Sequence, residues 1–188
     1  MESNINNTAL LVMDMQSAIL SNFPEAAPLI NKVARAITVA RDKKIPVLYI
    51  RVGFRTEAPE ISERNKSFSE SKTRYTSAKA AEFLKIEPAL APLEQEIVIT
   101  KRRISAFTGS DLEVVLRALG IQHIILTGVS TSGVVLSTVR EAADKDYQIT
   151  VLSDCCADRD EEVHHVLTTK VFPRQAAVLT IQEWAEIS

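Results

Sequence analysis

Cysteine, histidine and long apolar runs are scarce in this sequence. The shortage of cysteine argues against a disulfide-stabilised protein, and the shortage of long apolar runs argues against a membrane-spanning one. The two cysteines, Cys155 and Cys156, are adjacent and cannot form an ordinary structural disulfide with each other, which argues against a disulfide-stabilised secreted domain. No stretch approaches the roughly 18 apolar residues that a membrane span needs. A formal net charge of −2 gives no excess of positive charge for nucleic acid or for an anionic membrane surface.

The composition is otherwise typical of one globular domain. The chain has 188 residues, of which 46% are hydrophobic and 24% charged, and a chain of this size can bury a full core. Residues 1–7 are short and polar, unlike a signal peptide. We therefore expect a single cytoplasmic domain over residues 1–188 that binds a small molecule, with neither nucleic acid nor a membrane as its partner.

Short apolar runs alternate with helical patterns along most of the chain. The run from Thr8 to Met13 suits a strand buried on both faces, and further strands are predicted over residues 47–51, 96–100, 123–126, 148–152 and 177–179. Apolar residues at helical spacing predict helices over residues 30–41, 110–119, 134–142, 161–172 and 181–187. This alternation predicts an α/β fold, with a doubly wound, mainly parallel six-stranded sheet and helices on both faces.

The pattern weakens over residues 52–93. This stretch is rich in Ser, Lys, Arg and Glu, and its sizeable apolar anchors are Phe54, Phe68, Tyr75, Phe83 and Leu84. It is long for a connection within a compact domain, which indicates a functional loop or short helices of its own. We expect a lid or a subunit-contact segment, with disorder as the alternative.

Two charged residues stand where predicted strands end. Asp14 follows the apolar run that ends at Met13, and Lys101, with Arg102 and Arg103 behind it, follows the strand over residues 96–100. Because ligands of open α/β sheets bind beyond the carboxyl ends of the strands, these side chains could meet in one crevice. A partly desolvated carboxylate has a raised pKa and can act as a general acid or base. The alternative roles are a turn or cap for Asp14 and ordinary surface charge for the basic cluster.

A third strand, over residues 123–126, runs into a turn of small residues and then into a helix. The turn contains Gly128, Ser130, Thr131, Ser132 and Gly133. Backbone N–H groups and small hydroxyls at a helix N-terminus can hold negative charge. This turn is therefore the predicted anion-binding part of the site.

Taken together, three stretches resemble the signatures of the isochorismatase-like hydrolases, the superfamily that also contains nicotinamidases. They are Val12-Met13-Asp14-Met15-Gln16, Thr100-Lys101-Arg102-Arg103-Ile104-Ser105-Ala106-Phe107 and Thr127-Gly128-Val129-Ser130-Thr131-Ser132. The order and spacing of these stretches match across nearly the whole chain, apart from residues 51–91. The resemblance implies a Rossmann-like three-layer fold and an association into dimers or tetramers.

The resemblance also implies a catalytic triad of Asp, Lys and Cys, in which a thiolate attacks amides or nitriles. Asp14 and Lys101 match the first two members. Val134 stands at the position of the cysteine, and its side chain has neither a nucleophile nor a transferable proton. Cysteine-type amidase chemistry at this position is therefore excluded.

Three hypotheses remain. In the first, the chain resembles the true isochorismatases that also lack the cysteine. Asp14 would then protonate an enol ether, Lys101 would tune the carboxyl, and Arg51 or Arg103 would bind a substrate carboxylate. That branch carries an aromatic residue and a histidine where this chain has Ser130 and Ser132, so the substrate need not be isochorismate.

The second hypothesis uses Ser130, Thr131 or Ser132 as the nucleophile, although no histidine lies near them in the sequence. The third is a non-catalytic fold kept for binding a small molecule. Against the third, a buried Asp and Lys at facing strand ends are costly to desolvate, and an idle cavity would not require them.

The resemblance assigns further roles around the cavity. Gln16, within the first signature, is expected to contact substrate, and residues Val129 to Gly133 are expected to form an oxyanion hole next to a cis peptide bond between Val129 and Ser130. Phe23 is expected to be a packing residue that, because it lies beside the motif, could line the pocket and contact substrate. Nicotinamidases hold a metal through an Asp-x-His pattern after the second strand, whereas residues 51–55 of this chain contain no histidine. We therefore expect neither a metal nor a cofactor.

Three other groups are expected to have structural roles. His164 and His165 are neighbours in a predicted helix, so they face different directions, and both are predicted to lie on the surface. Cys155 and Cys156 are expected to pack in the interior rather than to react. Phe107 and Trp184 are expected to be packing residues, although Phe107 lies beside a motif and could line the pocket.

Overall fold

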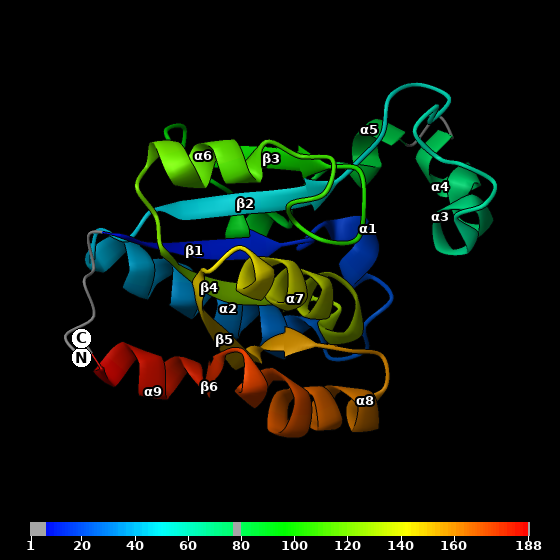
Figure 1. Cartoon of the computed structure of the whole chain (residues 1–188). Helices are drawn as coiled ribbons and strands as arrows, with labels where there is room; N and C mark the ends of the chain where they lie inside the picture. Colours follow the sequence, from blue (N-terminus) through cyan, green and yellow to red (C-terminus); the bar gives the residue numbers. More distant parts are fainter. Residues whose placement is uncertain (1–6, 77–79, 188) are drawn as a thin grey trace.

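The computed structural model describes residues 7–76 and 80–187; the first six residues of the predicted polar N-terminal stretch lie outside them. Its centre is a six-stranded sheet with the order β3-β2-β1-β4-β5-β6 in which every neighbouring pair is parallel (Figure 1). The predicted doubly wound α/β fold is confirmed. The strands are β1 Thr8–Met13, β2 Val47–Val52, β3 Ile97–Lys101, β4 His123–Val129, β5 Gln148–Ala157 and β6 Ala177–Leu179.

Helices cover both faces of the sheet. One core contains alternate β1 residues such as Leu11 together with Leu116 of α6 and Val139 of α7. The other core contains Val33 of α2 and Trp184 of α9. Burial on both faces explains why the strands of the parallel sheet are nearly continuous apolar runs. The helices are α1 Ser17–Leu20, α2 Ala26–Asp42, α3 Lys66–Glu70, α4 Lys72–Thr76, α5 Ala80–Phe83, α6 Leu112–Ala118, α7 Leu136–Asp144, α8 Glu161–Val166 and α9 Ile181–Glu186.

The C-terminal third differs from the prediction in two ways. Strand β5 continues to Ala157 because its register against β4 shifts, and polar residues that looked like a strand end lie inside it. Asp154, one of them, accepts a hydrogen bond from the N–H of Ile181 at 2.8 Å. The helix predicted over residues 161–172 divides into α8, a π-helical turn over Leu167–Val171 and a 3-10 turn over Phe172–Arg174. Pro173 in this last turn lacks the N–H that an α-helix would need.

The segment after β2 forms what we call the arm, residues 53–76 and 80–87, which contains helices α3, α4 and α5. It stands off from the sheet at the carboxyl end of β2 (Figure 1). Its own apolar cluster includes Phe68 and Ile61. The ring centroids of Phe54 and Tyr75 are 4.7 Å apart, and those of Tyr75 and Phe83 are 5.0 Å apart. The arm is thus held together largely by aromatic packing.

Within residues 7–76 and 80–187, every helix is too short or too polar to cross a membrane.

Candidate functional site

The site lies at the carboxyl ends of β1 and β4, the point from which successive strands are added in opposite directions along the sheet. Strands β1 and β4 are neighbours at the centre of the sheet, and Met13 pairs with Gly128 at their carboxyl ends. Ligands of open α/β sheets bind at such switch points. The approach of the two strands requires glycine, since a Cβ on Gly128 would lie 1.9 Å from the carbonyl oxygen of Met13 and the φ angle of Gly128 is +124°.

Asp14 and Lys101 meet at this edge of the sheet. Nζ of Lys101 lies 2.9 Å from Oδ2 of Asp14. Both residues are buried, since Lys101 is 2% exposed and Asp14 is 6% exposed. The ammonium also donates hydrogen bonds to the carbonyl oxygens of Arg103 at 3.0 Å and Ile104 at 2.8 Å. All three N–H groups of Lys101 therefore have partners within the protein.

The carboxyl of Asp14 is only half satisfied. Its Oδ1 is buried and has no hydrogen-bond partner among the described residues. Burial raises the pKa of Asp14, and this effect outweighs the opposing attraction of the Lys101 charge. A carboxyl with a raised pKa and one unused oxygen is suited to exchanging a proton with a ligand.

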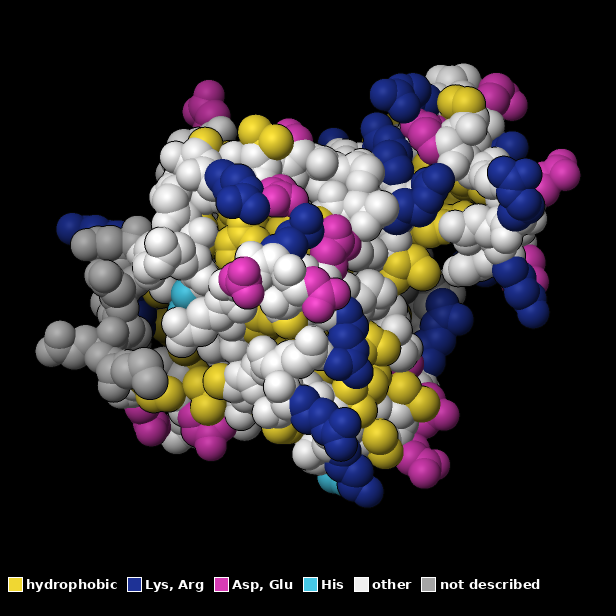
Figure 2. All heavy atoms as spheres, in the orientation of Figure 1, with side chains coloured by type: hydrophobic (Ala, Val, Ile, Leu, Met, Phe, Trp, Pro, Cys, Tyr) yellow, Lys and Arg dark blue, Asp and Glu magenta, His cyan; other side chains and the backbone are white. Residues whose placement is uncertain are grey.

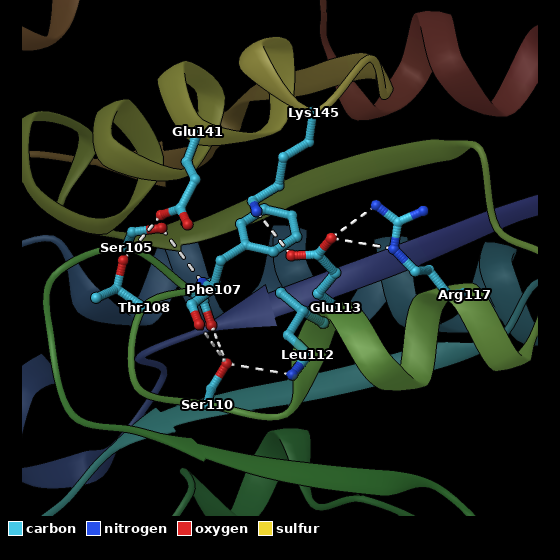
Figure 3. A network of polar contacts seen from close by, with 10 residues as sticks. Ser105, Phe107, Thr108, Ser110, Leu112, Glu113, Arg117, Glu141 and Lys145 are labelled. Atoms are coloured by element: carbon cyan, nitrogen blue, oxygen red, sulfur yellow. Dashed lines mark hydrogen bonds and ion pairs between the residues drawn. The ribbon is translucent and has the colours of Figure 1, made fainter.

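The loop after β3 is fixed by polar contacts, some of which Figure 3 shows. Ala106 donates its N–H to Oγ1 of Thr138 on α7 at 3.1 Å. Thr108 donates to Glu141 at 2.9 Å, and Lys145 pairs with Glu113 at 2.7 Å. The contacts of Ala106 and Thr108 hold the loop against α7, and the pair of Lys145 and Glu113 joins α7 to α6. Together they restrict the loop whose carbonyl groups bind Lys101.

Asp14 and Lys101 line a cavity of about 840 Å³ between the strand ends and the arm. Val134 lines the same cavity, as do Ser130, Ser132 and Gly133 of the turn after β4. Phe23 reaches it from the segment after α1. From the arm come Ser67, Phe68, Ser71, Arg74, Tyr75, Glu82 and Phe83. The arm therefore has the position that a lid requires.

The turn after β4 begins with the expected cis peptide bond between Val129 and Ser130. Ser132 donates its backbone N–H to Oδ2 of Asp158 at 2.7 Å, so one of the predicted oxyanion-hole donors is occupied by a carboxylate of the chain itself. A Cβ on Gly133 would lie 2.6 Å from Oγ of Ser130. Glycine at position 133 therefore leaves room for the Ser130 hydroxyl.

Thr131 is fully buried and is not part of the cavity lining. Its Oγ1 lies 2.8 Å from Nδ1 of His164. His164 was predicted to lie on the surface, but it is half-buried against the turn because α8 packs on the π-helical turn Thr131–Val135. Burial lowers the pKa of His164. His165 is exposed as predicted.

Three predicted substrate-binding residues have other partners. Gln16 is fully buried, donates to the carbonyl oxygens of Val52 at 3.1 Å and Phe83 at 2.6 Å, and accepts the N–H of Val52 at 2.8 Å. It joins β2 to the arm, and it does not line the cavity.

The two predicted carboxylate-binding arginines are also directed elsewhere. Arg51 donates to Oγ1 of Thr100 and to the carbonyl oxygen of Leu84, both at 3.1 Å. Arg103 donates to the carbonyl oxygens of Arg102 at 2.7 Å and Glu60 at 2.9 Å. Neither arginine lines the cavity. The sequence predicts that Arg51 lies at the end of a strand and that Arg103 follows one, but it does not predict the directions of their side chains.

Sequence reasoning missed Asp158, Arg159 and Arg74, which all line the cavity. Asp158 and Arg159 follow β5 directly, just as Asp14 follows β1, and this was the available signal. It was overlooked because the strand was expected to end at residue 152. Arg74 lies in the arm, where the pattern of the sequence is weakest.

Both cysteines are buried and lie outside the cavity lining. Cys155 packs in one core and Cys156 in the other. Burial raises the pKa of both thiols, that of Cys156 to about 12. A thiol with so high a pKa is a poor nucleophile at neutral pH. Within the described part of the chain, no three His, Cys, Asp or Glu side chains are grouped so that they could hold a metal ion.

The fold and the cavity define a doubly wound α/β protein whose site lies at the carboxyl ends of the central strands. A family model described as "Isochorismatase domain" matches residues 8–183, and the chain belongs to this family. The isochorismatase family protein YecD of Escherichia coli O157:H7 is 30% identical over 187 residues, and the match covers 97% of each chain. The ureidoacrylate amidohydrolase RutB of Yersinia enterocolitica is 32% identical over 169 residues, covering 78% of this chain and 74% of the relative.

Solved structures show the same fold. An isochorismatase family protein from Burkholderia thailandensis superposes with a TM-score of 0.88 at 27% identity, covering 97% of this chain and 95% of that one. The N-carbamoylsarcosine amidase from Thermoplasma acidophilum superposes with a TM-score of 0.75 at 24% identity, covering 93% and 96% of the two chains. The latter similarity concerns the fold alone.

Proposed function

We propose that this protein is a hydrolase that acts on a small carboxylate-bearing molecule by acid catalysis from Asp14, without a covalent cysteine intermediate. The observation that supports this most is the carboxyl of Asp14, because its pKa is raised and its buried Oδ1 has no partner in the described ranges of the chain. Val134 at the wall of the same cavity offers no atom for covalent catalysis. Proton transfer is then the chemistry left to the pair of Asp14 and Lys101.

An enol ether would be hydrolysed in three steps. Protonated Asp14 transfers its proton to the terminal carbon of the double bond, which leaves an oxocarbenium ion and an Asp14 carboxylate beside Lys101. Water adds to the cation and loses a proton to Asp14. The hemiketal then breaks into a ketone and an alcohol, and Asp14 is again protonated. The ammonium stabilises the carboxylate while it is charged.

The experiment compares the wild-type protein with Asp14→Asn on a panel of enol ethers, amides and small acids. The panel includes amides because relatives such as RutB are named as amidohydrolases. Asparagine keeps the shape of the side chain and removes the transferable proton, so turnover should fall by about 100-fold or more. A matched control is Asp42→Asn, at the exposed end of α2 and remote from the cavity lining, which should leave turnover unchanged.

A second candidate function is ligand binding without catalysis. The contact that favours it is the one between Ser132 N–H and Asp158, because it occupies a donor that an oxyanion would use. Binding of panel compounds with no turnover in the wild-type protein would support this candidate. It would also contradict acid catalysis by Asp14.

A further inference from the structure

The cavity contains positive charge that the protein does not neutralise. Among the described residues, its lining includes Lys101, Arg74 and Arg159. Lys101 has no donor left, since its three N–H groups contact Asp14 and two carbonyl oxygens. The guanidinium groups of Arg74 and Arg159 make no hydrogen bond or ion pair with another described residue.

The acidic side chains of the lining do not supply the missing partners. Asp14 pairs with Lys101, and Glu82 pairs with Lys85 at 2.6 Å. Asp158 accepts the backbone N–H groups of Ser132 at 2.7 Å and of Arg159 at 2.9 Å. Among the described residues of the lining, Arg74 and Arg159 are therefore the cations without an acidic partner, and they favour an anionic group of a ligand.

The arginines belong to opposite sides of the cavity. Arg74 lies on α4 of the arm, and Arg159 lies in the loop between β5 and α8 of the body. Figure 2 shows Lys and Arg side chains gathered on the arm, with the surface hollowed between the arm and the body. An anion in this hollow can be bound by the arm and the body together.

Two further features describe the rest of the ligand. The buried Oδ1 of Asp14 has no hydrogen-bond partner within residues 7–76 and 80–187, so a polar group of a ligand fits there. Aromatic side chains also line the cavity, and they suit a flat, apolar ligand body. These are Phe23, Phe68, Tyr75 and Phe83.

We propose that Arg74 and Arg159 bind the carboxylate of a small, planar, unsaturated acid and thereby determine the substrate class of this protein. The inference rests on the proposed function only in placing the reacting end of that acid at Asp14. Arginine is the residue that binds carboxylates through two parallel hydrogen bonds, so Lys in either position would keep the charge but lose much of the fit.

The test measures binding rather than turnover. Its probes are 4-fluorobenzoate and 4-fluorobenzamide, which share a flat body and differ in charge, titrated by ¹⁹F NMR against the whole chain. The wild-type protein should bind the carboxylate at least about tenfold more tightly than the amide. Arg74→Gln and Arg159→Gln should each weaken carboxylate binding about tenfold and change amide binding less than about twofold. Arg74→Lys should recover only part of the loss.

The matched controls are Arg64→Gln in the arm and Arg174→Gln after α8, exposed arginines outside the cavity lining that change the net charge equally. They should leave both affinities unchanged. The proposal is overturned if the wild-type protein does not bind the carboxylate more tightly than the amide. It is also overturned if the two control substitutions weaken carboxylate binding as much as Arg74→Gln and Arg159→Gln do. Equal losses for both probes would overturn it too.

The binding test of the arginines and the turnover test of Asp14 can fail independently of each other. Asp14→Asn should bind 4-fluorobenzoate within about twofold of the wild-type affinity, because the carboxylate is bound by the arginines. Carboxylate selectivity that depends on the arginines, without any turnover that depends on Asp14, would refute acid catalysis and leave the carboxylate site standing.

Discussion

Lys101 pairs with only one of the two carboxyl oxygens of Asp14. Nζ lies 2.9 Å from Oδ2, while Oδ1 is buried with no partner in the described part of the chain. The pair therefore secures the position of the carboxyl and leaves one oxygen for a ligand. It also makes the stability of the protein depend on the ammonium, since a charged carboxylate buried without it would be strongly unfavourable.

Replacing Lys101 by methionine should destabilise the fold. At pH 7 we expect a loss of about 3–5 kcal/mol in the free energy of unfolding, measured by urea denaturation, because the buried Asp14 loses its counter-charge. The double variant Asp14→Asn/Lys101→Met should recover most of that loss, since no buried charge remains. A double variant as unstable as Lys101→Met would show that packing, not charge, is the cause.

The cost of Lys101→Met should also depend on pH. Removing the ammonium raises the pKa of Asp14 above its already raised value. A group whose pKa is higher in the folded than in the unfolded state contributes stability below its unfolded pKa and loses that contribution as pH rises through the folded pKa. The difference in the free energy of unfolding between Lys101→Met and the wild type should therefore be smaller at pH 5 than at pH 8. The opposite trend would mean that Asp14 is not the group responsible.

Activity should fall as pH rises. The proposed mechanism needs protonated Asp14, and burial raises the pKa of this carboxyl. On a substrate from the panel, kcat/KM should be constant at low pH and decrease about tenfold per pH unit above that pKa. Circular dichroism over the same range separates loss of activity from unfolding. A rate that increases with pH instead would identify Asp14 as a base.

A cysteine introduced at position 134 should be reactive. Val134 lines the cavity together with Lys101 at the start of the helix after β4, and both a nearby cation and a helix N-terminus lower the pKa of a thiol. Iodoacetamide at pH 7 should modify the cysteine of Val134→Cys at least about tenfold faster than Cys155 or Cys156, as followed by mass spectrometry. Val135→Cys, at a fully buried site outside the cavity lining, is the control and should remain unmodified.

Alanine at Gly128 should be far more harmful than alanine at Gly120. Both glycines have a positive φ, which costs alanine about 1–2 kcal/mol. A Cβ at position 120 meets nothing within 4 Å, whereas one at position 128 would lie 1.9 Å from the Met13 carbonyl oxygen. The free energy of unfolding of Gly128→Ala, measured by urea denaturation, should be at least about 2 kcal/mol lower than that of Gly120→Ala. Equal stabilities would show that β1 and β4 can separate without cost.

The sheet and the charged pair could be predicted because local sequence determines them. Apolar runs fix the strands, and parallel pairing carries the residues after β1 and at the end of β3 to the same edge. The partners of long side chains could not be predicted in this way. Arg51 lies near the end of β2 and Gln16 follows β1, yet both donate to carbonyl groups of the arm, whose structure the sequence pattern did not predict.

The contact between Thr131 and His164 shows a second limit of sequence reasoning. The two residues are 33 positions apart, and the hydrogen bond arises only because α8 returns over the start of the helix after β4. Helical spacing indicated which way His164 faces relative to His165, but not which element would cover it. Such long-range packing is a property of the assembled fold.

The arm has an apolar cluster distinct from the two that sandwich the sheet. The two arginines proposed to bind the ligand belong to different parts of the molecule, Arg74 to the arm and Arg159 to the loop after β5. Under the proposed function, a differently shaped arm on the same strands would change the contacts that Arg74 makes with a ligand, while Asp14 and Lys101 stayed where they are. The half of the cavity that the arm contributes could then diverge without disturbing the pair proposed to transfer the proton.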